Sequence, residues 1–585
     1  MCGINAIFAY RDEAPPVNRR ELRTVRDRMA RRGPDGSGDW VSPDKRVGLG
    51  HRRLSIIDIT SDGDQPMGLY GGKYRIVFNG EIYNYQAIRE RMQAEGRLFR
   101  TTSDTEVLLH LYDKYGPEMV HHLRGMFAFA LWDEEKQGLL LARDGFGVKP
   151  LYLSDNGRCL RVASQVKALM VGGGIDKSPN PAGHVGFFLF GYVPEPHTLY
   201  RGIRSLGAGT MLWRDKRGNS WEKRFWGVQA AYQTRPPVRR PLRKSLLDSV
   251  AHHLVSDVPV GLFLSAGLDS ATLCGLAAEQ STDLKTVTLG FEEYAQTEND
   301  EAPLAELVAD LYGTEHQTRR VAGSDFANHA DALFEAMDQP SIDGVNVYFV
   351  AKAAAEVGLK VAISGLGGDE LFRGYNTFRQ LPKLVKPLSA VPFARHIGTI
   401  GRFATSPWIG QYASPKAAGL LELGTRSGDA YLLRRGLFMP WELARNLDSD
   451  FARQGLDELA PLTRLHHTTS GMTDWTGRVT ALEMTWYMRN QLLRDADWAG
   501  MAHSLEIRVP FVDRPLFEAA VRHGFGKQDM AATPEPALPQ AVRERPKTGF
   551  QVPVRDWLSG QSEAGNADDR GLRGWAREVY DRFTG

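Results

Sequence analysis

Short apolar runs that end at small polar loops dominate the hydrophobic pattern of the middle of the chain. Residues 258–264 are a continuous apolar run, which predicts a buried strand of a parallel sheet. A helical pattern follows over 271–280, and two further β-rich runs lie at 285–291 and 359–363. Alternating strands and helices predict a doubly wound parallel sheet, whose ligands bind beyond the carboxyl ends of the strands.

The first part of the chain has a different pattern, in which strands end at turns and a helix cap. Residues 50–58 end in an apolar run suited to a buried strand. Residues 76–85 predict another strand, which Asn79-Gly80 interrupts. The stretch 103–106 predicts a helix N-terminus, because a serine or aspartate side chain can cap it.

The second residue of the chain is a cysteine. Removal of Met1 would leave Cys2 with both a thiol and a free α-amino group. The thiol can attack a carbonyl, and the α-amine, which titrates near neutrality, can carry the proton. The alternative is an incidental buried cysteine, which is the more frequent case for a single cysteine near a terminus.

Together and in this order, Cys2 and these N-terminal strings resemble the class II glutamine amidotransferase domain. The resemblance runs to about Pro196. It implies an α+β N-terminal-nucleophile fold, an αββα sandwich of two sheets between helices. It also implies that Cys2 attacks the side-chain amide of glutamine, while the Asn79 amide and the Gly80 N–H form the oxyanion hole. Such a donor typically lowers the barrier by ~3–4 kcal/mol.

The same resemblance implies a pocket for glutamine as substrate. Arg53 would hold the α-carboxylate, because a guanidinium fork matches a carboxylate at two points. Asp104 and Glu81 would hold the α-ammonium and the edge of the pocket, and Ile57 would also contact glutamine. Taken alone, Arg53 would be a surface cation. The expected products are ammonia and a thioester at Cys2, which water resolves to glutamate.

The loop after the apolar run at 258–264 has the composition of a phosphate-binding turn, Ser265-Ala266-Gly267-Leu268-Asp269-Ser270. Strand, small polar loop and helix together direct backbone N–H groups at a phosphate. An ordinary strand-to-helix turn is the alternative. The loop resembles the SGGLDS loop of N-type ATP pyrophosphatases, with Ala266 in place of a glycine, which would cost ~1–2 kcal/mol at positive φ. The resemblance assigns ATP or pyrophosphate binding to Leu264, Ser265, Gly267, Leu268, Asp269, Ser270, Leu289, Ser364 and Gly365.

Two aspartates, Asp269 and Asp369, lie just past two predicted strand ends. Either could be a helix cap. A pair of hard oxygen ligands is also what Mg²⁺ uses on a triphosphate, and the resemblance places magnesium there. We therefore predict ATP and Mg²⁺ as cofactors, with Asp269 and Asp369 as metal ligands.

Three C-terminal strings complete the pattern, at 492–497, 501–513 and 545–550. With the earlier motifs they cover nearly the whole chain, which resembles glutamine-hydrolysing asparagine synthetases or a close amidotransferase relative. The resemblance implies a catalytic Lys547, which would stabilise charge during adenylation and amide formation. A lone lysine in a polar stretch is otherwise a solvated surface residue.

Departures from the family pattern leave the carboxylate acceptor open. Leu366 stands where asparagine synthetases commonly have a carboxylate, and leucine can neither exchange a proton nor bind an ammonium. Trp498-Ala499-Gly500 and Gln165 also differ from the residues that the family usually has at these positions. Either a changed acceptor pocket or neutral drift would explain these differences. Asparagine from aspartate is the default product. The alternatives are another carboxylate on a surface sugar or secondary metabolite, an intramolecular amide-forming cyclase, and a non-catalytic homologue.

Bulk properties add limits on partners and location. The 585 residues carry a net charge of +2, so no nucleic-acid or membrane-surface field is implied. Three cysteines without paired spacing, no signal peptide and no apolar run of spanning length predict a cytoplasmic protein. A homodimer is a further hypothesis.

The expected domain division follows the motifs. It comprises an amidotransferase domain at 1–205, a linker at 206–240, an asparagine-synthetase-like ATP pyrophosphatase domain with added helices at 241–560, and a polar tail at 561–585. Residues 380–485 carry helical spacings without a motif and are expected to cover the sheet and shape the acceptor site.

Overall fold

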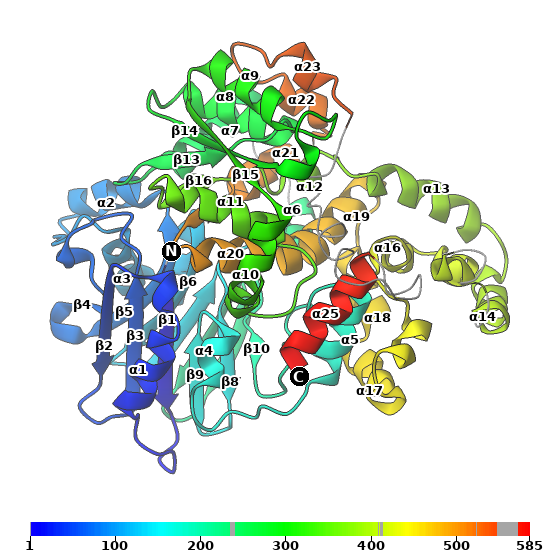
Figure 1. Ribbon diagram of the computed structural model, residues 1–585. Coiled ribbons are helices and arrows are strands. Elements are labelled where there is room, and N and C mark those ends of the chain that lie inside the picture. The colour runs from blue at the N-terminus through cyan, green and yellow to red at the C-terminus, as the bar shows by residue number, and fades with distance from the viewer. Residues whose placement is uncertain are drawn as a thin grey trace.

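The computed structural model describes residues 2–233, 240–406, 409, 414–521, 523–546 and 571–584. Figure 1 shows two parts: an N-terminal part built on antiparallel strands, in blue to cyan, and a later part built on a parallel sheet and many helices. The expected fold class, an αββα sandwich followed by a parallel α/β sheet with added helices, is confirmed.

The first sheet of the sandwich has the strand order β10-β8-β9-β1-β3-β2. Its central strand β1 (Gly3–Ala9) pairs antiparallel with β3 (Val47–Arg53) on one side and β9 (Cys159–Ala163) on the other. The remaining strands are β2 (Gly36–Val41), β8 (Tyr152–Asp155) and β10 (Arg204–Ser205). Cys2 therefore directly precedes a strand that is fixed on both edges.

The second sheet has the order β12-β11-β7-β6-β5-β4. Alternation along β5 explains the layers, because Val77 belongs to the core between the sheets whereas Ile76 and Phe78 face the outer helices. Those helices are α2 (Tyr85–Ala94) and α3 (Asp104–Tyr115), and α1 (Arg19–Asp27) and α4 (Val166–Met170) cover the first sheet. The strands are β4 (Met67–Leu69), β5 (Tyr74–Ile82), β6 (Gly125–Asp133), β7 (Gly138–Arg143), β11 (Thr210–Asp215) and β12 (Ser220–Arg224).

Two of these strands, β11 and β12, lie within residues 206–240, which we expected to be a linker. β11 pairs with β7 along its whole length, and β12 pairs with β11. The sandwich therefore continues to Arg224. A short helix, α6 (Val228–Gln233), follows it.

The second part contains a five-stranded parallel sheet of order β15-β14-β13-β16-β17. The chain builds outward from β13 to β14 and β15, and then returns to the other side of β13 with β16 and β17. The order therefore reverses beside β13, where the loops after β13 and β16 form the usual ligand crevice. The strands are β13 (Val260–Phe263), β14 (Lys285–Phe291), β15 (Glu315–Val321), β16 (Val361–Ile363) and β17 (Glu506–Arg508).

Helices surround this sheet and fill the rest of the part. Those joined most directly to the strands are α7 (Leu242–Leu254), α8 (Leu268–Ala278), α9 (Ala302–Tyr312), α10 (Gly323–Ala336), α11 (Val345–Glu356), α12 (Gly368–Leu371) and α20 (Arg494–Ala502). The expected helices after residue 380 are present as α13 (Thr377–Ser389), α14 (Ala394–Thr405), α15 (Leu420–Leu423), α16 (Ser427–Arg435), α17 (Ser449–Leu459), α18 (Pro461–Thr468), α19 (Trp475–Leu482) and a π-helix over Glu483–Leu493. Short helices α21 (Arg514–Ala520), α22 (Lys527–Ala531) and α23 (Gln540–Arg543) follow β17.

The end of the chain is also a packed helix, α25 (Leu572–Thr584), within the stretch expected as a polar tail. Its residues Trp575, Ala576 and Val579 are buried in the main core of the second part. The Tyr580 hydroxyl lies 2.7 Å from Nδ1 of His184 on the buried helix α5 (Pro181–Phe190). The last helix therefore packs against α5. No helix in the described ranges is both long and apolar enough to span a bilayer.

Candidate active sites

Cys2 lies in a closed site at the start of β1. Its backbone N–H donates to Oδ1 of Asn79 at 2.9 Å, and its thiol lies 4.0 Å from the carbonyl oxygen of Leu54. Burial raises the pKa of the Cys2 thiol. A nucleophile with a raised pKa needs a nearby base, which supports a role for the α-amino group at this position.

Asn79 and Gly80 have the geometry expected of an oxyanion hole. Asn79 accepts the Cys2 N–H at its side-chain carbonyl oxygen, and its Nδ2 is buried without a hydrogen-bond partner among the described residues. A buried amide N–H normally finds an acceptor, so this donor is available to a ligand. Gly80 has a φ of 152°, and a Cβ there would lie 2.1 Å from the carbonyl oxygen of Met126. Only glycine fits this position.

Arg53 ends β3 and is buried, but its guanidinium is already engaged by one loop. Nη1 donates to the carbonyl oxygen of Thr60 at 2.5 Å and to Asp64 at 2.9 Å, and Nη2 donates to the carbonyl oxygen of Asp58. The structure therefore places Arg53 on the strand next to β1, with its guanidinium bonded to residues 58–64. Ile57 is buried in the core beneath the second sheet.

Asp104 and Glu81 are buried carboxyl groups whose charged forms are disfavoured. Asp104 begins α3 and accepts the Ile82 N–H at 2.9 Å, and burial raises its pKa to about 7. Burial and the nearby charge of Glu506 raise the pKa of Glu81 well above its usual range. Both groups would ionise more readily beside a cation. The α-ammonium of glutamine is such a cation.

The wall of this pocket comes partly from the second part of the chain. Nη2 of Arg508 on β17 lies 3.4 Å from Oε2 of Glu81, and its Nε donates to Glu506 at 2.7 Å. Arg508 is fully buried and also donates to the carbonyl oxygens of His253 and Val255 at 2.8 and 2.6 Å. Sequence reasoning gave neither Glu506 nor Arg508 a role, although both fall within the string 501–513.

The loop after β13 has the compact geometry of a phosphate-binding turn. The Ser270 hydroxyl lies 2.9 Å from that of Ser265, accepts the Ser265 N–H at 3.1 Å and contacts the Gly267 carbonyl at 3.1 Å. Gly267 precedes the first turn of α8, so this loop and a helix N-terminus converge. Ala266 is buried and is not among the non-glycine residues with positive φ, so its replacement of glycine costs no backbone strain.

Asp269 and Asp369 both bond to the side chain of Lys527, so the two predicted metal ligands lie close together. Nζ of Lys527 on α22 lies 2.8 Å from Asp369 and also bonds to Asp269. Burial lowers the pKa of Lys527, but the two carboxylates outweigh it and leave the pKa raised. Lys527 was missed from the sequence because a single lysine in a polar stretch carries no local signal.

These two carboxylates fit the magnesium prediction in part. No group of three or more histidine, cysteine, aspartate or glutamate side chains suited to a metal occurs in the part of the chain that the structure describes. Mg²⁺ on a nucleotide commonly uses one or two carboxylates and takes its other ligands from phosphate and water. Two aspartates beside a phosphate loop are therefore a sufficient protein contribution.

The other predicted nucleotide contacts surround the same strand ends. Leu264 and Leu289 are buried beside the loop, and the Leu264 N–H donates to Val287 at 2.9 Å. The Ser364 N–H donates to the carbonyl oxygen of Arg508 at 2.8 Å, and a Cβ on Gly365 would lie 2.9 Å from Cβ of Asp269. Lys547 lies outside the described residues.

Two residues that differ from the family pattern, Leu366 and Trp498, are packed or hydrogen-bonded in the structure. Leu366 packs at the boundary of the two large cores of the second part. Four residues further along the chain, burial and Asp369 raise the pKa of Glu370 to about 8, and Glu370 accepts the Tyr375 hydroxyl at 3.0 Å. Trp498 is fully buried, and its Nε1 donates to Asp495 at 2.8 Å.

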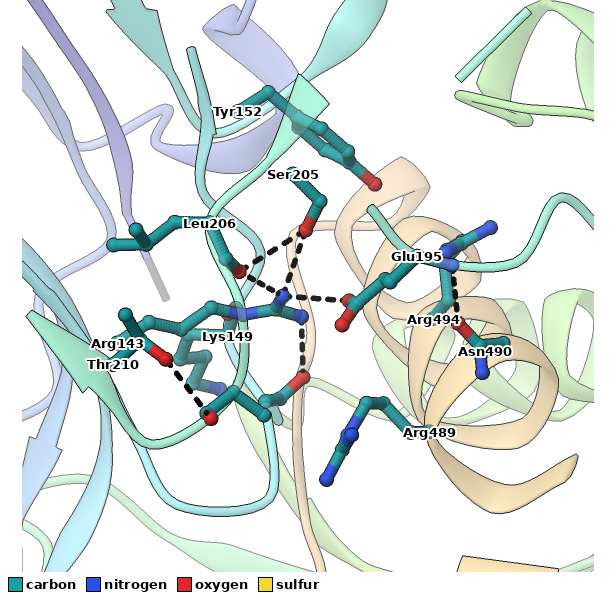
Figure 2. A network of polar contacts seen from close by, with 12 residues as sticks. Arg143, Lys149, Tyr152, Glu195, Ser205, Leu206, Thr210, Arg489, Asn490 and Arg494 are labelled. Carbon is teal, nitrogen blue, oxygen red and sulfur yellow. Dashed lines mark hydrogen bonds and ion pairs between the residues drawn. The ribbon is translucent and has the colours of Figure 1, made fainter. Parts of the chain in front are cut away.

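A buried polar network joins the two parts (Figure 2). Arg143, at the end of β7, donates to Glu195 at 2.6 Å, to Ser205 at 2.9 Å and to the Leu206 carbonyl at 2.7 Å. The backbone N–H of Glu195 in turn donates to Oδ1 of Asn490, on the π-helix, at 2.8 Å. The N-terminal sandwich is therefore bonded directly to the helical layer of the second part.

Comparison with known proteins decides the family. Residues 1–226 match the family described as a glutamine amidotransferase domain, and residues 241–571 match the family described as asparagine synthase. Asparagine synthetase [glutamine-hydrolyzing] 1 of Bacillus subtilis is 33% identical over 581 residues, which cover 96% of this chain and 88% of that protein. The chain belongs to the glutamine-hydrolysing asparagine synthetase family.

Other relatives resemble this chain to a similar degree. A putative asparagine synthetase of Mycobacterium tuberculosis is 34% identical over 91% of this chain and 83% of its own length. Amidase chry2 of Gibberella zeae is 30% identical over 65% of this chain and 60% of its own length. The predicted enzyme class, an asparagine synthase of the glutamine-hydrolysing type, is confirmed. The family implies the use of ATP.

Proposed function

We propose that this chain transfers the amide nitrogen of glutamine to a carboxylate that ATP has activated as an acyl-adenylate. The observation that carries the proposal is the contact of Arg508, from the synthetase sheet, with Glu81 beside Cys2. One strand thus contributes to both candidate sites. Ammonia released at Cys2 would be lost by protonation in bulk water, and adjoining sites avoid that loss.

In the first half-reaction the Cys2 thiol gives its proton to the α-amino group and attacks the side-chain carbonyl of glutamine as the thiolate. The α-ammonium of Cys2 then returns this proton to the departing nitrogen. The oxyanion that forms is held by Nδ2 of Asn79, the buried donor without a partner among the described residues, and by the Gly80 N–H. Collapse of the intermediate releases ammonia and leaves a thioester, which water hydrolyses to glutamate. Asp104 and Glu81 hold the substrate ammonium, and Arg53 is the candidate for its carboxylate.

In the second half-reaction the loop 265–270 and the N-terminus of α8 hold the phosphates of ATP. Lys527 offsets phosphate charge, and Asp269 and Asp369 are the candidate ligands of Mg²⁺. When bound, the ion would neutralise charge on the phosphates. The acceptor carboxylate attacks the α-phosphate and displaces pyrophosphate, and ammonia then displaces AMP. Lys547 stays a predicted catalytic residue.

For the acceptor we propose a carboxylate larger than free aspartate. Leu366 presents an apolar side chain where a small, doubly charged substrate would need a polar partner, and an unsatisfied buried polar group costs ~1–3 kcal/mol. Asparagine formation from aspartate is the second candidate, favoured by the family itself.

The test is transfer of ¹⁵N from amide-labelled glutamine, followed by mass spectrometry with ATP and a panel of carboxylates that includes aspartate. The proposal predicts AMP, pyrophosphate and a labelled amide of a larger acceptor. Asparagine formed efficiently at ordinary aspartate concentrations, with rescue of an asparagine auxotroph, would rule out the acceptor proposal. Absence of label in every product would rule out amide transfer as a whole.

A further inference from the structure

Helix α14 exposes an almost continuous apolar side. The exposed fractions are 76% for Phe393, which precedes its first turn, 54% for Ile397, 72% for Ile400 and 68% for Phe403. These positions recur at intervals of three and four residues, so they share one side of the helix. A contiguous exposed apolar patch of this kind marks an interaction surface.

The helix is attached to the protein by its polar side, the reverse of the usual arrangement. Arg402 bonds to Glu422, and Nη1 of Arg395 lies 3.9 Å from Asp429. A Cβ on Gly398 would lie 2.2 Å from the Glu422 backbone nitrogen, so the helix packs closely against α15 on that side. A helix in a soluble protein normally turns its apolar stripe to the core. Here the ion pairs and the close packing fix the apolar stripe outward.

Phe393, the first residue of the apolar stripe, has an unusual backbone conformation. Phe393 has a φ of 57°, a left-handed conformation that bulky residues rarely adopt. Such strain persists where the surroundings enforce it, and it is frequent at functional surfaces. Because Phe393 gains no burial from this conformation, packing of its own side chain does not explain it.

The charge of the same segment is one-sided. Residues 377–405, which form α13 and α14, contain five arginines and lysines and no aspartate or glutamate. Arg379, Lys383 and Lys386 are exposed at helical spacing on α13 and form no ion pair within the described residues. The net charge of +2 for the whole chain conceals this concentration. Figure 1 shows α13 and α14 standing out from the body of the molecule.

We propose that this segment, residues 377–405, is an arm that docks on an anionic lipid surface. An apolar helix face beside exposed basic residues, without acidic ones, is the pattern of helices that bind at the headgroup boundary of membranes. A second copy of the chain fits less well, because a two-fold contact through this face would bring two positive segments together. The arm begins two residues after Tyr375, so docking would hold the synthetase site near the membrane.

The experiment is sedimentation of the full chain with vesicles of phosphatidylcholine, with or without phosphatidylglycerol. We expect binding to the anionic vesicles only, weakening as salt is added. The variant Ile397→Ser/Ile400→Ser/Phe403→Ser should lower the affinity roughly tenfold or more. Leu307→Ser/Leu311→Ser on α9 is the matched control, since these leucines are 44% and 39% exposed outside the arm, and it should bind as the parent does.

A second pair of measurements keeps the test independent of folding. Lys383→Gln/Lys386→Gln should weaken anionic-vesicle binding by about fivefold per lysine and leave glutamine hydrolysis unchanged. Circular dichroism and glutaminase activity report on the fold of each variant. No binding to anionic vesicles, or equal binding by the triple-serine variant, would overturn the proposal. Conversion of a dimer to a monomer by that variant, without vesicle binding by the parent, would assign the face to self-association instead.

Discussion

The guanidinium of Arg32 is bonded at two points to the carboxylate of Asp497, with N–O distances of 2.6 and 3.0 Å. Arg32 belongs to the N-terminal sandwich and Asp497 to α20 in the second part, and both are buried. Nε of Arg32 also donates to the backbone carbonyl of Cys2 at 3.1 Å. An acidic residue of the second part therefore orients the arginine that bonds to the backbone of Cys2, the proposed nucleophile.

Removal of that acidic residue should affect both stability and glutamine hydrolysis. In Asp497→Ala the Arg32 charge stays buried without its partner, and we expect a loss of ~3–5 kcal/mol in urea unfolding. Arg204→Ala breaks an exposed pair with Glu222 in the same sandwich and should cost less than ~1 kcal/mol. Equal effects of the two variants would contradict a special role for the buried pair.

Substitutions of the proposed nucleophile and oxyanion donor should impair glutamine hydrolysis and spare the synthetase half-reaction. Cys2→Ala should abolish glutamine hydrolysis and keep product formation from high ammonium. Asn79→Ala should lower the hydrolysis rate ~10²–10³-fold, because it removes a preorganised donor. The measurements are glutamate release and AMP formation with each nitrogen source. Loss of both activities in a folded Cys2→Ala protein would disprove this division.

The raised pKa of Asp104 predicts that glutamine binding depends on pH. A carboxyl group with a pKa of about 7 is largely protonated at pH 6 and largely ionised at pH 8, and only the ionised form attracts an α-ammonium. Calorimetry on Cys2→Ala should therefore show up to ~10-fold weaker binding at pH 6 than at pH 8. Asp104→Asn should bind weakly at both values. A pH dependence that survives in Asp104→Asn would assign the titration to another group.

The cation site between the two aspartates should control pyrophosphate release without affecting glutamine hydrolysis. Asp269→Asn, Asp369→Asn and Lys527→Met should each lower pyrophosphate release by at least ~10²-fold, since stabilisation of developing charge at phosphates usually contributes most to such catalysis. Glutamate release should stay near the parent rate. Lys223→Met, at an exposed lysine that pairs with Glu118 in the N-terminal sandwich, serves as a control and should keep pyrophosphate release. Unchanged turnover in all three site variants would show that the nucleotide binds elsewhere.

Much of each candidate site can be proposed from the sequence because its residues lie in short contiguous strings at strand ends. Cys2, Asn79, Asp269 and Ser270 each belong to such a string, and the backbone brings its members together locally. Lys527 and the Arg32–Asp497 pair could not be found in this way, because they meet partners more than a hundred residues distant. No periodicity in the sequence reports such a contact.

The misjudged boundaries have a different cause. β12 is an edge strand whose five residues are all exposed, so it carries no apolar alternation. Its sequence therefore resembles a loop, and only pairing with β11 makes it a strand. The closing helix α25 has an amphipathic pattern over 572–583 that the sequence does show, but the pattern does not reveal that its three buried residues dock in the core of the second part.

One hydrogen bond described above gives the enzyme a mechanical property. The Ser364 N–H, in a predicted nucleotide loop, donates to the carbonyl of Arg508, whose side chain reaches Glu81 in the glutamine pocket. A single residue on the edge strand of the sheet thus contacts both candidate sites. The route from the Ser364 loop to Glu81 therefore runs through the backbone and side chain of Arg508, which is buried along its whole length.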